Sequence, residues 1–146
     1  MSAKPIPDDY PRVIPYLLIE SVDGLISFLE DVFDAKATCK LTRQDGTVMH
    51  AEARIGDAVI MMGEPIGVFG PMPGSVFVYV EDCDAVFRKA VDAGATPVLE
   101  PMDMTHAGER YGGVSDQRGI VWWIATHKED VTPEEQQRRI DLASHD

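Results

Sequence analysis

The chain has 146 residues and a formal net charge of −12, because 25 acidic residues outnumber 13 basic ones. A surface this acidic repels phosphate backbones and anionic lipids, which argues against nucleic acid and membranes as partners. No apolar run approaches the roughly 20 residues that span a bilayer, and the first residues lack the apolar core of a signal peptide. Cys39 and Cys83 form neither a disulfide framework nor a metal-binding Cys pair. We therefore expect a cytoplasmic protein.

The first half of the chain predicts a strand, a helix and then three strands. Residues 13–20 are nearly continuously apolar, which is typical of a strand buried on both faces. Ser21 follows as an N-cap, and apolar residues then repeat at helical spacing up to Asp34, a residue type that tolerates the left-handed conformation past a helix end. The Asp-Gly step at 45–46 lies between two alternating runs and predicts a hairpin. A further short strand is expected at 58–62.

The same pattern starts again after a segment rich in Gly and Pro. Residues 75–82 predict a strand, and Asp82 is expected to cap a helix that ends at Ala93-Gly94. Further strands follow, the last of them at 119–126. Thr132, with Pro and Glu at the first and third positions after it, forms a capping box that predicts a short terminal helix.

The two halves form an internal repeat with an offset of about 61 residues. Ile19-Glu20 corresponds to Val80-Glu81 at an offset of 61, and Gly46 corresponds to Gly108 at an offset of 62. Each half of roughly 60 residues leaves too much surface to bury a good core alone. We therefore predict an α+β fold of two tandem βαβββ modules that pair as curved sheets around a cleft.

The predicted organisation is one compact domain with five parts. They are an N-terminal arm (1–12), a first βαβββ module (13–62), a linker (63–74), a second βαβββ module (75–127) and a C-terminal helical tail (128–146).

Four segments carry a family resemblance: VIPYLLIE, GTVMHAEARIGDAVIMM, VYVEDCDAVFRKAVDAGAT and ERYGGVSDQRGIVWWIATHKEDVT. Their ordered set, over residues 13–132, resembles the vicinal-oxygen-chelate superfamily of glyoxalases, bleomycin-resistance proteins and extradiol dioxygenases, and within it the PhnB-like branch. That branch usually shows Asp-Pro-Phe-Gly followed by His or Asn, where this chain has Asp116-Gln117-Arg118-Gly119-Ile120. The resemblance implies the two-module fold and a homodimer.

The resemblance also implies four metal-ligand positions, usually His and Glu, on the first and last strands of each module. In this chain these positions fall on Ile14, Met61 (or Met62 if the register slips by one), Ser75 and Trp123. Such side chains cannot hold a hard or borderline divalent ion. We therefore expect no metal and no cofactor at this location.

Aromatic and apolar residues take the place of the ligands on the same strands. Strand alternation puts Tyr16, Leu18, Phe77 and Tyr79 on the same face as Trp123. This set predicts a cleft that binds a small apolar or aromatic molecule. The alternative is that these side chains fill the space themselves, as in many small barrels.

Two polar groups are further candidates for the site. His50 and Glu52 alternate with small apolar residues, so they face the cleft or solvent, as an acid–base pair or as two ligands of a displaced metal site. The alternative is a solvated strand face with a histidine satisfied by its neighbour. Arg110 aligns with Val48 at an offset of 62, on the same alternating set as His50, and is therefore expected to point inward. There it would bind a ligand carboxylate or phosphate, or else form an ion pair with Asp116 or Glu100.

Three functions remain open on the sequence alone. The leading hypothesis is metal-free binding of a small molecule in the aromatic cleft. A second is an enzyme, either a metal-dependent lyase or dioxygenase with relocated ligands or a metal-free acid–base catalyst that uses His50 and Glu52. The third is a structural or interaction module whose cleft is filled.

Overall fold

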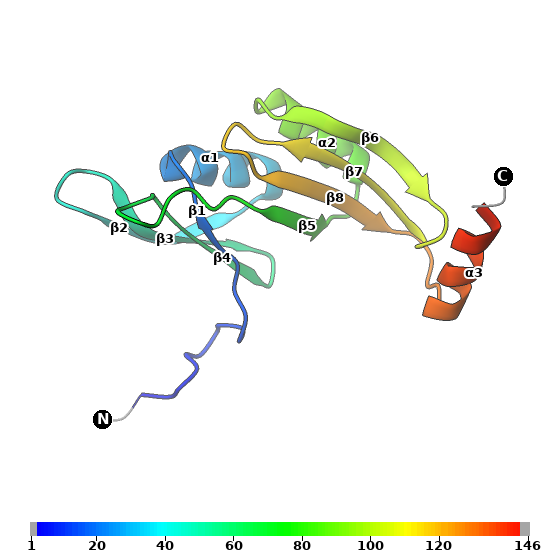
Figure 1. Ribbon diagram of the computed structural model, residues 1–146, viewed down its shortest axis with the longest axis horizontal. Coiled ribbons are helices and arrows are strands. Elements are labelled where there is room, and N and C mark those ends of the chain that lie inside the picture. Colours follow the sequence, from blue (N-terminus) through cyan, green and yellow to red (C-terminus); the bar gives the residue numbers. More distant parts are fainter. Residues whose placement is uncertain (1–2, 144–146) are drawn as a thin grey trace. The chain divides into compact units, whose positions relative to one another are not determined.

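A computed structural model describes residues 3–143 of the chain (Figure 1). The first two and last three residues, which end the predicted arm and tail, lie outside the described residues. The chain divides between Gly74 and Ser75 into two compact units. Each unit contains one βαβββ module with a four-stranded mixed sheet, so the predicted α+β class with two tandem modules is confirmed.

The first module has one helix against one face of its sheet. Its elements are β1 (Tyr16–Leu18), α1 (Val22–Phe33), β2 (Lys36–Thr42), β3 (Val48–Ile55) and β4 (Ala58–Gly63). The sheet order is β1-β4-β3-β2, with β1 parallel to β4 and the other pairs antiparallel. Leu25 and Leu29 of α1 are fully buried, as are Ala51 and Ala53 of β3, because the small residues let the helix approach the sheet closely.

The second module repeats this topology and adds a terminal helix. Its elements are β5 (Ser75–Tyr79), α2 (Cys83–Asp92), β6 (Thr96–Met104), β7 (Glu109–Ser115), β8 (Val121–His127) and α3 (Pro133–Ala143). The sheet order is β5-β8-β7-β6, and α2 lies behind β6 and β7 in Figure 1. Val114, Trp122 and Ile124 are fully buried on the α2 side of this sheet.

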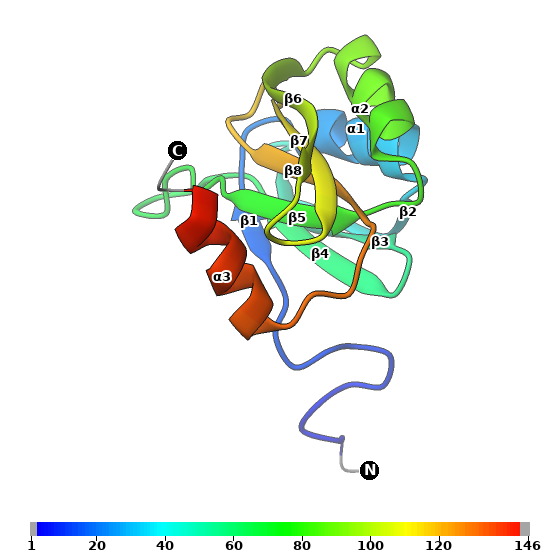
Figure 2. The same ribbon diagram turned by 90° about the vertical axis from the view of Figure 1, so that its right-hand side faces the viewer.

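The helix α3 lies beyond the end of this sheet in Figure 1 and beside the strands in Figure 2, so it does not cover the sheet. Arg139 attaches it to the module by donating to the Thr105 carbonyl oxygen at 2.7 Å and pairing with Glu129 at 2.9 Å. Thr132 Oγ1 accepts from the Glu135 amide at 3.2 Å, which confirms the predicted N-cap. The Glu135 side chain binds arginines of α3 instead of turning back to complete the capping box.

The other predicted helix ends are confirmed in position, but one cap differs in chemistry. Asp82 accepts from the Ala85 amide at 3.2 Å and caps α2 as expected. Ser21 directly precedes α1, but it makes no side-chain capping bond and has a positive φ of 62°. The first free amide, that of Val22, instead donates to Glu64 Oε1 at 3.2 Å. A carboxylate from β4's end therefore supplies the missing acceptor.

The expectation of a strand buried on both faces over residues 13–20 is wrong. The strand β1 covers only Tyr16–Leu18, Tyr16 is 46% exposed and Val13 is 82% exposed. The strand lies at the edge of its sheet, and α1 covers a single face. Pro15 has no backbone N–H for the ladder, which also shortens the strand.

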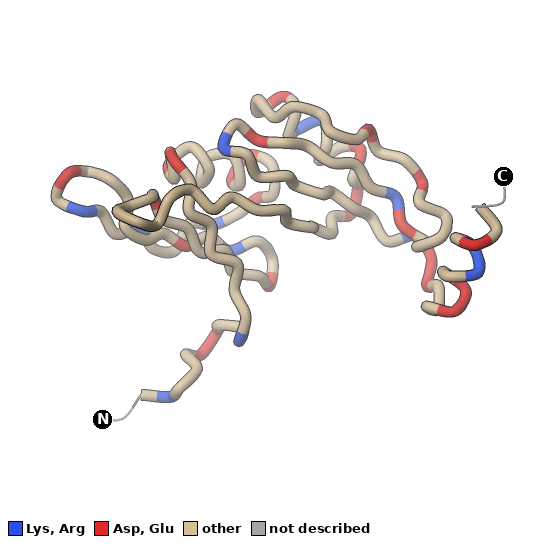
Figure 3. The backbone as a smooth tube through the Cα atoms, in the orientation of Figure 1, with Lys and Arg blue, Asp and Glu red and all other residues tan. Residues whose placement is uncertain are grey.

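Charged residues avoid two of the strands of the second module (Figure 3). β5 and β8, which pair in parallel, contain no Lys, Arg, Asp or Glu. Acidic residues lie instead on helices, turns and β6–β7. Over residues 3–143, no helix combines the length and apolar character needed to cross a membrane.

Candidate functional site

Four aromatic rings lie on the face of the second sheet that α2 leaves open. We call this set, Phe77, Tyr79, Tyr111 and Trp123, the aromatic face. The Phe77 ring lies 5.2 Å from Tyr79 and 5.8 Å from Tyr111, and Tyr111 lies 6.2 Å from Trp123, all with interplanar angles of 69° to 83°. These distances and angles match the edge-to-face geometry that aromatic pairs prefer. The four rings therefore form one connected apolar surface.

Two neighbours fix the position of Trp123. The indole Nε1 donates to Ser75 Oγ at 2.7 Å. Gly113 pairs with Trp123 across the ladder, and a Cβ added there would lie 2.7 Å from the indole ring. The ring thus occupies the space that any side chain at Gly113 would need. These contacts hold the indole in one orientation on the open face.

The two faces of the second sheet differ sharply in exposure. Trp122 is fully buried against α2, and its Nε1 donates to Asp116 Oδ2 at 2.8 Å. On the other face, Phe77 is 47% exposed and Tyr79 is 61% exposed. Large aromatic side chains exposed together are unusual on soluble proteins and mark interaction or ligand sites.

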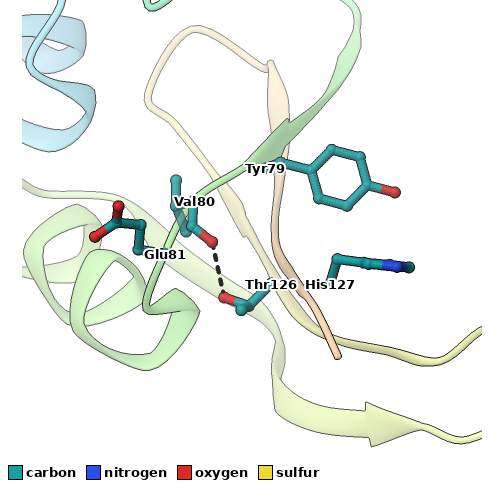
Figure 4. A pocket seen from close by; sticks show the side chains of 5 residues that line it. All are labelled: Tyr79, Val80, Glu81, Thr126 and His127. Carbon is teal, nitrogen blue, oxygen red and sulfur yellow. Dashed lines mark hydrogen bonds between the residues drawn. The ribbon is translucent and has the colours of Figure 1, made fainter. Parts of the chain in front are cut away.

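A hollow of about 640 Å³ adjoins the aromatic face at Tyr79 (Figure 4). Tyr79, Val80, Glu81, Thr126 and His127 line it. Figure 4 shows the Tyr79 and His127 rings side by side and pointing the same way, while Glu81 points in another direction. The Thr126 hydroxyl donates to the Val80 carbonyl oxygen at 3.0 Å and ties β8 to the end of β5.

Glu109 contacts both of the rings that line this hollow, those of Tyr79 and His127. Its Oε1 accepts from the Tyr79 hydroxyl at 2.8 Å and lies 3.3 Å from His127 Nδ1, while His127 Nε2 lies 2.7 Å from Asp130. The hydrogen bond to Glu109 raises the pKa of Tyr79, and the bonds to Asp130 and Glu109 raise the pKa of His127. Glu109 Oε2 is buried and has no hydrogen-bond partner among residues 3–143. One carboxylate therefore positions a phenol and an imidazole together.

Arg110 lies on the opposite face of the sheet, against α2. Its Nε and Nη2 donate to the two oxygens of Asp84 at 3.0 and 3.1 Å, and its Nη1 donates to Asp103 at 3.3 Å. These bonds raise the pKa of Arg110, and the bond to Arg110 lowers the pKa of Asp84. The structure does not bring Arg110 to the aromatic face, and its ion-pair partners are not the expected Asp116 or Glu100.

The misplacement of Arg110 comes from a one-residue error in aligning the modules. Glu52 pairs with Met61 in the first sheet and Gly113 pairs with Trp123 in the second, so β7 is offset from β3 by 61 residues instead of the expected 62. A slip of one residue turns every side chain of a strand to the other face. Glu109, not its neighbour, therefore lies on the open face.

In the first module the corresponding face is polar. Tyr16 Oη lies 3.1 Å from His50 Nδ1, His50 Nε2 lies 2.7 Å from Glu52 Oε2, and the Tyr10 hydroxyl donates to Glu52 Oε1 at 2.5 Å. We call these four residues the Glu52 cluster. Glu52 is only 7% exposed. The structure thus brings the predicted His50–Glu52 pair together and adds a tyrosine at each end.

The N-terminal arm covers part of this face. The Arg54 guanidinium donates to the Asp9 carbonyl oxygen at 3.0 Å and lies 5.3 Å from the centre of the Tyr10 ring. A cavity of about 430 Å³ lies between the arm and the sheet. Its wall consists of Pro5, Ile6, Pro7, Tyr10, Pro11, Arg12, Ile14, Glu52 and Met61. The hydrogen bond from Tyr10 and that from His50 lower the pKa of Glu52, so its carboxylate is charged at neutral pH.

The donor set at the four family ligand positions does not fit a divalent ion. Ile14 and Met61 line the arm cavity with apolar atoms. Leu18, a predicted cleft residue, forms an antiparallel backbone bridge with Met72. Ser75 already accepts the Trp123 indole proton. Over residues 3–143, no three His, Cys, Asp or Glu side chains are grouped so as to hold a metal. No step is therefore assigned to a metal at these positions.

Sequence reasoning missed four residues of these two faces. Tyr111 and Glu109 follow from the corrected register of β7, since they share a strand face with Gly113. Gly113 itself carried a signal, because a glycine inside a strand marks a close approach of another group. Tyr10 carried none, because nothing in the arm's sequence shows which part of the sheet it meets.

Comparison with known proteins agrees with this fold. Residues 15–124 match the model of the Glyoxalase/Bleomycin resistance protein/Dioxygenase superfamily. An uncharacterized protein of Mycobacterium bovis is 29% identical over 136 residues, which cover 86% of this chain and 89% of that protein. An uncharacterized protein of Mycobacterium tuberculosis is also 29% identical over the same length, with 79% of that protein covered.

Solved structures give the same result. TioX from Micromonospora sp. ML1 is 26% identical with a TM-score of 0.66, and the match covers 80% of this chain and 98% of TioX. A PhnB protein from Bacillus cereus has the same fold, with a TM-score of 0.65 at 18% identity over 80% of this chain and 99% of that one. The chain belongs to the Glyoxalase/Bleomycin resistance protein/Dioxygenase superfamily, with PhnB-like proteins among its structural neighbours.

Proposed function

We propose that this chain binds a small apolar or aromatic molecule on the aromatic face of its second module, and that binding needs no metal. The observation that carries this proposal is the exposure of Phe77 and Tyr79 beside a Trp123 ring that is already fixed by Ser75 and Gly113. A preformed aromatic surface loses little conformational freedom when a ligand stacks on it.

The geometry favours binding over a merely structural role for these rings. A packed core would bury them, as it buries Trp122 on the other face of the same sheet. Phe77 and Tyr79 instead keep about half of their surface exposed, and an open hollow of about 640 Å³ adjoins Tyr79. Its lining combines apolar atoms with a few polar groups, as small-molecule sites do.

The polar groups beside the aromatic face would orient the ligand. Glu109 fixes the Tyr79 hydroxyl, and His127 places a cationic edge next to it when protonated. The ligand would thus be an aromatic or aliphatic body with one group that donates a hydrogen bond, because Tyr79 gives its own proton to Glu109 and its oxygen is left to accept. The family model covers both binding proteins and enzymes by its description, which is compatible with this role.

The test uses N-phenyl-1-naphthylamine, a neutral dye whose fluorescence rises when it enters an apolar site. Protein is first dialysed against a chelator and analysed for Zn, Ni, Mn and Fe. We expect saturable binding by the metal-free protein, loss of binding in Trp123→Ala, and retention in Trp123→Phe, which keeps a ring. Equal binding by wild type and Trp123→Ala, or binding that requires added metal, would contradict the proposal.

A further inference from the structure

The Glu52 cluster of the first module connects an exposed phenol to a buried carboxylate. Tyr16 is 46% exposed, whereas Glu52 is 7% exposed, and His50 lies between them with one ring nitrogen bonded to each. Gly63 leaves room for this arrangement, since a Cβ there would lie 3.2 Å from the Tyr16 hydroxyl and 2.8 Å from the Met49 carbonyl oxygen.

The charge on Glu52 decides where the protons sit. An ionised carboxylate only accepts hydrogen bonds, so both Tyr10 and His50 Nε2 must donate to it. In a neutral imidazole the other nitrogen, Nδ1, is then an acceptor. The proton between Tyr16 and His50 therefore belongs to the Tyr16 hydroxyl, and the Tyr16 oxygen keeps its lone pairs free to face a substrate.

In this hydrogen-bond arrangement an imidazole can activate a hydroxyl group, and a buried carboxylate orients the imidazole. Tyr10 and Arg54 hold the carboxylate end, because Tyr10 donates to Glu52 and Arg54 binds the arm beside Tyr10. A solvated strand face has no need of a buried carboxylate with two donors. Burying a carboxylate costs free energy unless it is hydrogen-bonded, and both oxygens of Glu52 have a partner here.

We propose that Tyr16 and His50 form a metal-independent acid–base site that removes a proton from carbon in a small carbon acid. Tyr16 is the group that touches the substrate and His50 receives the proton that Tyr16 gives up. Glu52 is a positioning residue, which orients the imidazole through Nε2. The site lies in the first module and is independent of the binding proposed for the second.

The proton transfer balances without an oxidant or a cofactor. The substrate C–H bond breaks, its proton forms a new O–H bond at Tyr16, and the original Tyr16 proton moves to His50 Nδ1. The C–H electron pair remains on the substrate as an enolate or enters a bond to a leaving group. The imidazolium then returns its proton through Tyr16 to the substrate or to water, so the site is restored.

A suitable probe is 5-nitrobenzisoxazole, whose ring opens after a single deprotonation at carbon. The base removes the C–H proton, the electron pair forms the nitrile, and the N–O bond breaks to give a coloured cyanonitrophenolate. We expect wild type to catalyse this reaction and Tyr16→Phe and His50→Ala each to lower kcat by about 10²-fold, the range of general acid–base catalysis. KM should stay unchanged in Tyr16→Phe, because the ring remains.

Two further measurements separate catalysis from a structural role. Added imidazole should restore part of the rate in His50→Ala, and Glu52→Gln should lower kcat without unfolding the protein by circular dichroism. His106→Gln, in the turn between β6 and β7, serves as a matched control and should leave the rate unchanged. Equal rates in wild type, Tyr16→Phe and His50→Ala would overturn the proposal while leaving dye binding at Trp123 unaffected.

Discussion

The two modules share one topology but differ in the chemistry of their open faces. Tyr16 pairs with Met61 as Phe77 pairs with Trp123, so the four positions correspond between the sheets. The first module uses its face for hydrogen bonds that lead to a buried carboxylate, whereas the second uses its face for aromatic contacts. At the position of Glu52 the second module has a glycine that accommodates an indole.

The helix-covered face and the open face of each module follow different constraints. Both modules bury small or apolar residues beneath their helix, since packing density decides stability there. The open faces carry no such common requirement and have diverged. Function in this fold is therefore to be sought on the open faces.

The largest expected effect contrasts the two faces of β8 through its adjacent tryptophans. Trp122→Ala should lower the free energy of unfolding by about 3–5 kcal/mol, the usual cost of removing a buried aromatic ring. It also leaves Asp116 without the indole proton it accepts at 2.8 Å. Trp123→Ala should cost less than half as much in urea unfolding. Equal losses would show that Trp123 is a core residue and that the two faces of the sheet do not differ in this way.

A smaller loss of stability is expected when a side chain is added at Gly113, next to the Trp123 ring. Gly113→Ala places a Cβ 2.7 Å from the indole ring, so the ring must shift. We expect a loss of about 1–3 kcal/mol in unfolding free energy, as for other overpacked sites, together with weaker dye binding. Gly70→Ala is a matched control, since nothing lies within 4 Å of its Cβ. Unchanged dye affinity in Gly113→Ala would mean that dye binding does not depend on the position of the Trp123 ring.

The stability of the first module at acid pH should depend on the charge of Glu52. Hydrogen bonds from Tyr10 and His50 lower the folded-state pKa of Glu52, so its stabilisation is present above its ordinary pKa of 4.5 and is lost as pH falls through the lower folded value. Thermal unfolding from pH 6 to pH 3 should therefore be less acid-sensitive in Glu52→Gln than in wild type. Parallel curves would mean that the cluster does not hold a charged Glu52.

The smallest expected effect is of opposite sign and belongs to the second module. Asp130 and Glu109 raise the pKa of His127, so its stabilisation is present below the ordinary value of 6.5 and disappears as pH rises through the higher folded value. In His127→Gln the midpoint of thermal unfolding should therefore change slightly less between pH 6 and pH 8 than it does in wild type. An unchanged slope would assign the effect elsewhere.

Much of the fold could be predicted from the sequence, because periodicity and turn residues act locally. The alternation around His50 and the helical stripe ending at Asp34 each predicted an element that the structure contains. The edge position of β1 depends on strand order, which periodicity does not encode. The apolar run at 13–20 therefore predicted more burial than an edge strand has.

The candidate site was less predictable, since it depends on register between strands. Phe77 and Trp123 followed from alternation along single strands, but the face of Arg110 required the pairing of β7 with β8. Tyr10 reaches Glu52 across 42 residues of chain, a contact that no local pattern specifies. Whether the site binds the expected molecule stays a prediction.

The most direct test of the central claim compares two exposed phenylalanines. Phe77 on the aromatic face is 47% exposed, and Phe69 in the 63–74 segment is 58% exposed. Titration of chelator-treated protein with N-phenyl-1-naphthylamine should show that Phe77→Ala loses dye affinity while Phe69→Ala keeps the wild-type value. Equal affinity in all three proteins, or a loss confined to Phe69→Ala, would contradict the assignment of binding to the aromatic face of the second module.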